Sequence, residues 1–162
     1  MISEKMAKAI NEQINKEIYS AYLYVGMAAY AGGLGLGGIA NWFQLQAKEE
    51  LGHAQKFMHY LSEQGSDLVL KAIAAPDQKF TSVAAAFDKT LEHEKEVTAS
   101  IRDLVTLAKK EADYATEIFL QWFVTEQIEE EASVSDIIQK LAIGGKMGNS
   151  LLMIDKTLGL RK

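Results

Sequence analysis

Glu50 and His53 are the residues whose types and spacing most directly suggest chemistry. They lie three positions apart within residues 46–61, which read as part of a long helix, so both side chains face the same side. That side is apolar, because at spacings of three and four it also carries Ile39, Phe43, Phe57 and Leu61. An ionised carboxylate buried there is costly unless it is paired, hydrogen-bonded or bound to a metal. The pair therefore predicts a partner for Glu50 inside the fold.

An acid interrupts the apolar stripe of each of the four long helices that the sequence predicts. The four acids, each near the middle of its helix, are Glu17, Glu50, Glu94 and Glu130. In an antiparallel pair of helices, residues equidistant from the turn lie at the same height. The midpoint of the first two acids falls within residues 32–38 and that of the last two within residues 111–113, and both segments read as turns or breaks. We therefore expect all four acids to meet in one layer.

Four carboxylates this close would repel one another and take up protons unless a cation lay among them. Four carboxylates with one imidazole and no thiolate suit two divalent ions of the iron or manganese kind. Zinc remains possible, although structural zinc sites favour Cys and His. A carboxylate from each helix of a bundle, with Glu-x-x-His spacing, is a known di-iron arrangement. The rival interpretation is a structural or partner-binding helical bundle whose acids are solvated and which binds no Fe(II).

Five helices must position these acids. Apolar periodicity predicts them at about residues 3–30, 39–64, 82–110, 114–143 and 147–158. Ser3 and Asp113 are suitable N-caps for the first and fourth helices. A second apolar flank on the first helix, formed by Ile18, Tyr22 and Val25, predicts that this helix is buried on more than one side. No strand-like alternation persists, so the expected fold class is all-α: a four-helix bundle with a short C-terminal helix.

Residues 65–81 form a long connection that contains the only proline, Pro76. Such a segment can reach roughly 56 Å at ~3.3 Å per residue, whereas a 26-residue helix is only about 39 Å long. The connection can therefore cross the whole bundle, which would leave the second and third helices parallel. The alternative is a disordered insert.

The composition restricts the other classes of function. The 162 residues suit a single domain, and a net charge of -5 without any Lys/Arg cluster argues against nucleic acid as a partner. Cysteine is absent, which excludes disulfides and thiolate metal ligands. The N-terminus carries charges too early for a secretory signal, and no apolar run approaches the ~20 residues of a membrane span. We expect a cytoplasmic protein without membrane contact.

Taken together, these features resemble the non-haem ferritins of bacteria and archaea. The resemblance covers essentially the whole chain and rests on four motifs in order: EIYSAYLY (17–24), ANWF (40–43), KEELGHA (48–54) and FLQWFVTEQIEEE (119–131). It implies a ferritin-like bundle with a crossover between the second and third helices. The glycine-rich turn GGLGLGG (32–38) departs from the polar and aromatic loop usual in that family.

The resemblance also implies the ligands of a di-iron centre. They are Glu17 and His53 on one iron, Glu50 bridging both, and Glu94 and Glu130 on the second iron with Gln127 beside it.

Further positions follow from the same resemblance. Tyr24 would lie close to the centre with a redox role, unless it is an ordinary core tyrosine. Glu49, Glu126 and Glu129 resemble a third iron site on the cavity side of some prokaryotic ferritins, although a solvated acidic face is the alternative. No haem is expected, because Leu51 stands where haem-binding relatives place a methionine.

As a function, the resemblance implies a ferroxidase. It would oxidise Fe(II) with O2 or H2O2 and store the Fe(III) mineral inside a homo-oligomeric shell of 24 subunits. The alternative within enzymes is a di-metal oxidase or peroxidase that uses the same site without storing mineral.

Overall fold

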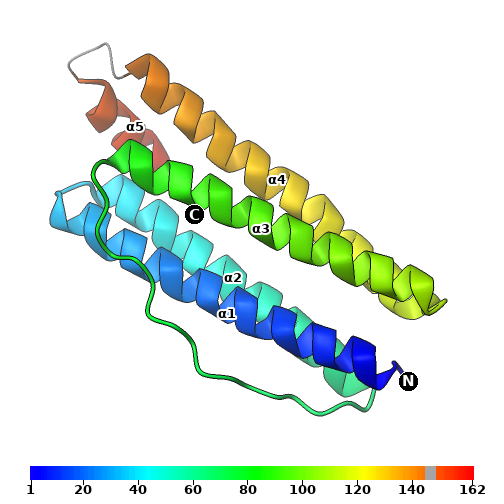
Figure 1. The fold of residues 1–162 in the computed structure, drawn as a ribbon. Helices are drawn as coiled ribbons and strands as arrows, with labels where there is room; N and C mark the ends of the chain where they lie inside the picture. Colours follow the sequence, from blue (N-terminus) through cyan, green and yellow to red (C-terminus); the bar gives the residue numbers. More distant parts are fainter. Residues whose placement is uncertain (145–148) are drawn as a thin grey trace.

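The chain folds into four long helices and one short one in a computed structural model, which describes residues 1–144 and 149–162. The helices are α1 (Glu4–Gly33), α2 (Gly37–Glu63), α3 (Val83–Lys110), α4 (Tyr114–Gly144) and α5 (Ser150–Leu158) (Figure 1). The described residues contain no strand, so the predicted all-α class is confirmed. The expected start of the last helix at residue 147 lies outside the described residues.

Local side-chain chemistry sets the helix ends. The Ser3 hydroxyl accepts a hydrogen bond from the Met6 N–H at 3.0 Å, and Asp113 Oδ1 accepts one from the Thr116 N–H at 3.1 Å. Both N-caps predicted from the sequence are therefore confirmed. Between α3 and α4 the chain reverses through Ala112, whose φ of 54° lies in the left-handed region.

The first turn is tighter than the sequence indicates. α1 continues to Gly33 and α2 begins at Gly37, two residues earlier than predicted, so Leu34–Leu36 make the whole reversal. Gly35 lies at its centre with a φ of 77°, a conformation that strains residues with a side chain.

The connection between α2 and α3 runs the length of the bundle beside α1 (Figure 1). Two asparagines on α1 hold its backbone: Asn11 Nδ2 donates to the Asp67 carbonyl at 3.0 Å, and the Lys71 N–H donates to Asn15 Oδ1 at 2.8 Å. The segment is thus an ordered crossover and not the alternative disordered insert. It leaves α2 and α3 parallel, as predicted.

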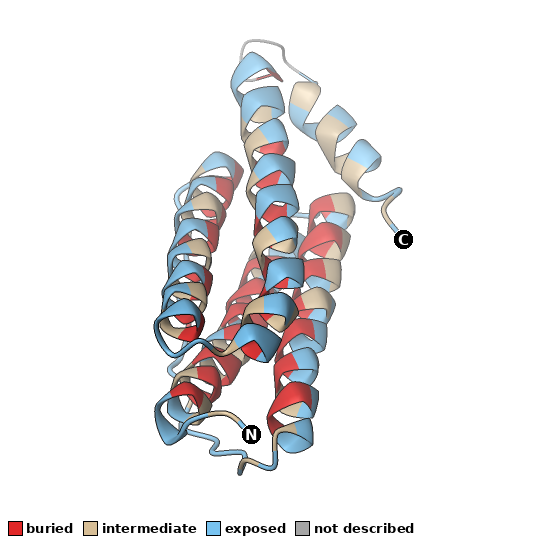
Figure 2. Cartoon of the chain, turned by 90° about the vertical axis from the view of Figure 1, so that its right-hand side faces the viewer, coloured by how far each residue is buried: buried red, intermediate tan, exposed pale blue. Residues whose placement is uncertain are grey.

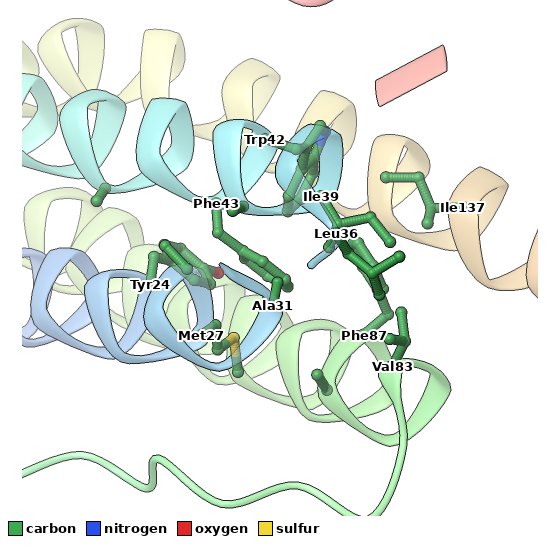
Figure 3. Packing of buried hydrophobic residues seen from close by; sticks show 14 of the residues in the cluster. Tyr24, Met27, Ala31, Leu36, Ile39, Trp42, Phe43, Val83, Phe87 and Ile137 are labelled. Carbon is green, nitrogen blue, oxygen red and sulfur yellow. The ribbon is translucent and has the colours of Figure 1, made fainter. Parts of the chain in front are cut away.

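The buried residues face the interior of the bundle (Figure 2). The apolar residues among them form two clusters. The cluster near the α1–α2 turn contains Phe43 and Phe87, whose stacked rings lie 4.9 Å apart between centroids (Figure 3). The cluster at the other end contains Phe57 and Phe123, stacked at 4.0 Å. The four predicted acids lie on the helices between these clusters, so apolar residues close the acid layer from both ends.

The expected burial of a second flank on α1 is wrong for the single chain. Tyr22 is 46% exposed and Val25 52% exposed. α2, α3 and the crossover cover other sides of α1 and leave this flank partly exposed to solvent. The flank instead lines an open apolar groove together with Leu51 and Ile73.

Candidate metal centre

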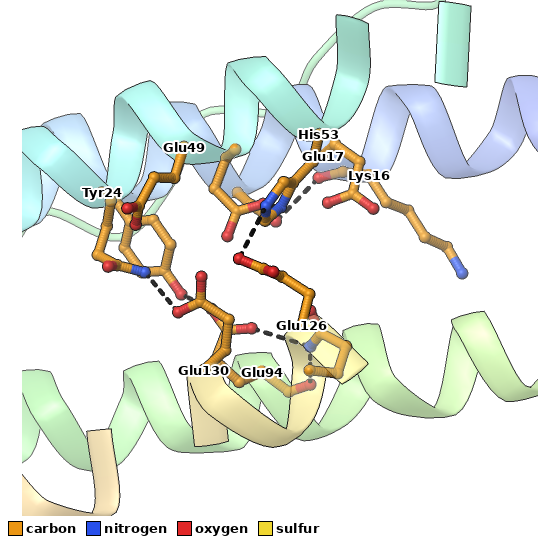
Figure 4. Close-up of polar contacts among 12 residues, drawn as sticks. Lys16, Glu17, Tyr24, Glu49, His53, Glu94, Glu126 and Glu130 are labelled. Carbon is orange, nitrogen blue, oxygen red and sulfur yellow. Dashed lines mark hydrogen bonds and ion pairs between the residues drawn. The ribbon is translucent and has the colours of Figure 1, made fainter. Parts of the chain in front are cut away.

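The four predicted acids converge on the interior of the bundle, one from each long helix (Figure 4). Each is at most 5% exposed: Glu17, Glu50, Glu94 and Glu130. The arrangement follows from helix register, because each acid occupies an inward position halfway along its helix. Four carboxyl groups in an apolar interior require protons, donors or cations.

One group of candidate ligands joins α1 and α2. Oxygens of Glu17 and Glu50 and a nitrogen of His53 all lie within 4.8 Å of one another, and all three residues are buried. Glu50 Oε2 lies 3.3 Å from His53 Nδ1, as the helix spacing requires. Gln13 Nε2 donates to Glu17 Oε1 at 2.8 Å. Glu17 Oε2, in contrast, is the one buried side-chain oxygen of the described residues without a hydrogen-bond partner.

A second group joins α2 and α4 through the same histidine. Ligand atoms of His53, Glu126 and Glu130 lie within 4.8 Å of one another, and His53 Nε2 is 3.8 Å from Glu126 Oε1. Gln46 Nε2 donates to Glu130 Oε2 at 2.8 Å, which fixes that carboxyl group from the α2 side.

Glu94 lies across the layer and belongs to neither three-residue group. The Tyr24 hydroxyl donates to Glu94 Oε1, and Gln127 Nε2 donates to Glu94 Oε2 at 3.1 Å (Figure 4). Tyr24 and Gln127 are therefore both adjacent to the acid layer, where the sequence resemblance expects them.

Among the described residues, the three acids of the predicted third iron site do not form one group of close ligand atoms, although Glu49 and Glu126 line the same surface pocket. Glu126 lies beside His53, as described above, whereas Glu49 Oε2 accepts a bond from Arg161 Nη2 at 2.6 Å. Glu129 is exposed to solvent on α4. The third site stays a prediction, and Glu126 is the member whose carboxylate groups with His53 and Glu130.

Burial and mutual repulsion favour the protonated acids. Burial raises the pKa of Glu94 and of Glu130 to about 7, and for Glu130 the charge of Glu94 adds to the effect. Burial likewise raises the pKa of Glu17, and it raises that of Glu50 well above its usual range, with the charge of Glu17 next in importance. A divalent cation would stabilise the ionised forms, so the layer is suited to exchange protons for metal.

The remaining histidines lie outside the centre. His93 is turned away from Glu94 and its Nε2 is 2.7 Å from the Ser20 hydroxyl, while burial lowers its pKa to about 4. The prediction that His93 does not share the metal of Glu94 agrees with this orientation. His59 is exposed, as predicted.

Sequence reasoning missed the residues that hold the acids. Gln13 and Gln46 each lie four residues before a predicted ligand, on the same helix face, and this spacing was a usable signal. No comparable signal marked Arg161, because it reaches α2 from the far end of the chain.

The fold and the site together define a class: helical bundles with a buried layer of carboxylates and histidine that are suited to bind metal ions. The chain matches the Ferritin family, described as a ferritin-like domain, over residues 7–143. It belongs to that family. Among the described residues, no helix has an apolar stretch long enough to span a bilayer.

Individual relatives are similar over nearly their whole lengths. The chain is 42% identical to a probable bacterial non-heme ferritin-like protein of Haemophilus influenzae, covering 98% of this chain and 96% of the relative. It is 41% identical to the bacterial non-heme ferritin of Campylobacter jejuni, covering 96% and 93%. Among solved structures, an open pore ferritin from the archaeon Archaeoglobus fulgidus is 49% identical, covers 100% of both chains and superposes with a TM-score of 0.98.

Proposed function

We propose that the acid layer is a di-iron ferroxidase centre and that its product is stored inside an assembled shell. Membership of the ferritin family makes the protein an iron-storage ferroxidase, with iron as its substrate. The family does not itself identify the residues that bind iron in this chain. The observation that carries our assignment is the convergence of four buried acids and His53 from four helices.

The side chains present fit iron. Glu17 Oε2 is buried and lacks a partner among the described residues, which leaves one oxygen free to bind a cation. The donors are carboxylate oxygens and an imidazole, which suit Fe(II).

We assign the ligands by combining this geometry with the family pattern. Glu17 and His53 would hold the first Fe(II), and Glu50 would bridge both ions. Glu94 and Glu130 would hold the second ion. Gln127 and Tyr24 would act through Glu94, which both contact. The further set Glu49, Glu126 and Glu129 would take a third iron.

The chemistry supplied by the bound iron is one-electron oxidation of each Fe(II), with O2 or H2O2 as the acceptor. The protein contributes the rest. The carboxyl groups give up their protons as the cations enter and then neutralise the metal charge. Tyr24 holds Glu94 in place, and the aromatic clusters at both ends of the layer limit access by water.

The stored product requires a closed assembly of subunits. We propose a homo-oligomeric shell of 24 copies with a single ferritin-like domain per chain, in the cytoplasm. Its mass would be about 430 kDa for a chain of 17.9 kDa.

Size-exclusion chromatography after aerobic Fe(II) loading tests the proposal, with protein and iron absorbance recorded together. Many iron ions per subunit that co-elute with a particle near 430 kDa support oxidation coupled to storage. Iron limited to about two ions per subunit on a small oligomer would instead identify a di-metal oxidase without storage. Absence of bound iron would refute the metal centre.

A matched pair of variants assigns the iron to the acid layer. Glu50→Gln removes the central carboxylate, and Glu63→Gln removes an exposed acid from the end of the same helix. We expect the first variant to lose rapid Fe(II) oxidation and the second to keep it.

A further inference from the structure

The C-terminal segment, residues 149–162, docks on the N-terminal half of α2. Asp155 Oδ1 accepts a hydrogen bond from the Ile39 N–H at 2.8 Å and so caps α2, whose own N-cap residue Leu36 provides no side-chain bond. The Asn41 amide donates to the Arg161 carbonyl at 3.2 Å. These contacts deliver the side chain of Arg161 to the middle of α2.

The Arg161 guanidinium contacts two α2 residues at once. Nη1 donates to Gln46 Oε1, and Nη2 donates to Glu49 Oε2 at 2.6 Å. The guanidinium carbon lies 5.3 Å from the centre of the Trp42 ring, so the group also makes a cation–π contact. A planar fork with two donors suits this pair of acceptors, and lysine could not reproduce the geometry.

One of these contacts reaches the acid layer. Gln46 is fully buried, and its amide has two distinguishable ends: the oxygen faces Arg161 and the nitrogen donates to Glu130 Oε2 at 2.8 Å. If the amide turned over, its N–H groups would face the guanidinium and its oxygen would face a carboxyl group, so both contacts would be lost. Arg161 therefore fixes the orientation in which Gln46 holds Glu130.

The other contact affects charge. Glu49 is the α2 member of the proposed third iron site, and its Oε2 is already paired with the guanidinium of Arg161. A divalent ion that bound Glu49 would lie close to the Arg161 guanidinium, and the two positive charges would repel each other. The ion pair thus opposes occupation of the third site.

We propose that Arg161 is a positioning residue for the metal centre, which orients Gln46 toward Glu130 and keeps iron from Glu49. The inference rests on the proposed di-iron function. It assigns to the C-terminal segment a control over how many iron ions each subunit binds: two while the ion pair is intact, and a third when the guanidinium is withdrawn.

Calorimetric titration of the metal-free, assembled protein with Fe(II), without oxygen, tests the proposal. We expect two tight sites per subunit in the unchanged protein. Arg161→Gln and Arg161→Met both remove the charge, so each should strengthen a third site by roughly threefold to tenfold. Arg161→Lys keeps a cation near Glu49 and should leave the third site weak.

The route through Gln46 has its own variant. Gln46→Met keeps the length and loses the donor to Glu130, so the second of the two tight sites should weaken while the third does not strengthen. Elution volume and thermal unfolding of each variant verify that the shell has assembled. Arg161 is only partly buried and belongs to neither apolar cluster, so assembly should survive its replacement.

The outcomes separate the two proposals. If the unchanged protein binds no Fe(II) tightly, the di-iron function fails. If it binds two ions and the neutral Arg161 variants bind the same two with unchanged affinity, the inference fails and the di-iron function stands. Three tight sites in the unchanged protein, or a lysine variant that behaves like the neutral ones, would also overturn the inference.

Discussion

Anaerobic binding of Fe(II) to the metal-free protein should release protons, in a number that depends on pH. Glu94 and Glu130 have pKa values of about 7 because they are buried near other acids. Both must ionise to bind a cation. The pH dependence of the proton count, compared with that of a variant of either group, therefore tests whether these two carboxyl groups are ligands.

The magnitude follows from the two pKa values. At pH 6.5 a group with a pKa of about 7 is roughly three-quarters protonated, so the pair should release about 1.5 protons per subunit. At pH 8 each group is roughly one-tenth protonated, and the pair should release only about 0.2. The pKa of Glu50 is raised well above its usual range, so Glu50 should add protons at both pH values. For Glu94 and Glu130 alone, the difference between the two pH values is thus about 1.3 protons per subunit. Glu17, whose pKa burial also raises, should add to the release.

Calorimetry in two buffers that differ in ionisation enthalpy, at each pH, measures the number. Oxygen must be excluded, because oxidation and hydrolysis of iron release protons of their own. Glu94→Gln should remove about half of the share calculated for Glu94 and Glu130, whereas Glu92→Gln, an exposed neighbour on α3, should leave the release unchanged. Equal proton release at pH 6.5 and pH 8 in the unchanged protein would refute the assignment of these two ligands.

Three further predictions concern stability and rate. Since the folded-state pKa of Glu94 is raised, this group should lower the free energy of unfolding of the metal-free protein as pH rises from about 4.5 to about 7, by up to about 3 kcal/mol. In thermal unfolding at a fixed scan rate, Glu94→Gln should lose less stability over this pH range than the unchanged protein. Tyr24→Phe keeps the buried ring and loses the donor to Glu94, so the free energy of unfolding should change by at most about 1 kcal/mol. Fe(II) oxidation, followed by stopped-flow absorbance, should slow roughly threefold to tenfold. An unchanged rate would make Tyr24 an ordinary core tyrosine. Gly38→Ala would place a Cβ 1.7 Å from the Asp155 carbonyl oxygen and should release α5 from α2. Trypsin should then cleave faster at Lys156. Gly37→Ala, whose Cβ meets nothing within 4 Å, should leave the cleavage rate unchanged.

Much of the fold and of the acid layer could be predicted because both depend on periodicity. Equal spacing from a turn determines which residues of two antiparallel helices lie at the same height, so Glu17 could be placed beside Glu50 by counting residues. The length of residues 65–81 limited the topology in the same way. Both arguments need only helix geometry and chain length.

The unpredicted part depends on side-chain orientation and on contacts between distant segments. Gln46 could be placed near the layer from its spacing, but not the direction of its amide, which the Arg161 guanidinium decides. The family pattern groups Glu126 with Glu49 and Glu129, but it gave no sign that Glu126 also lies 3.8 Å from His53. The flank at Tyr22 was predicted to be buried and is exposed, because an apolar stripe does not reveal whether another element covers it.

One glycine of the glycine-rich turn makes the close contact between α2 and α5 possible. The family resemblance marked residues 32–38 only as a departure from the usual loop, and most of their glycines meet no close neighbour. Gly38 is different, because the backbone of Asp155 and Gly159 lies where any side chain would project. Without that close approach α5 could not cap α2, and Arg161 would not reach Gln46 and Glu49. Gly38, about a dozen residues along α2 from Glu50, is therefore linked to the proposed iron ligands through the C-terminal segment.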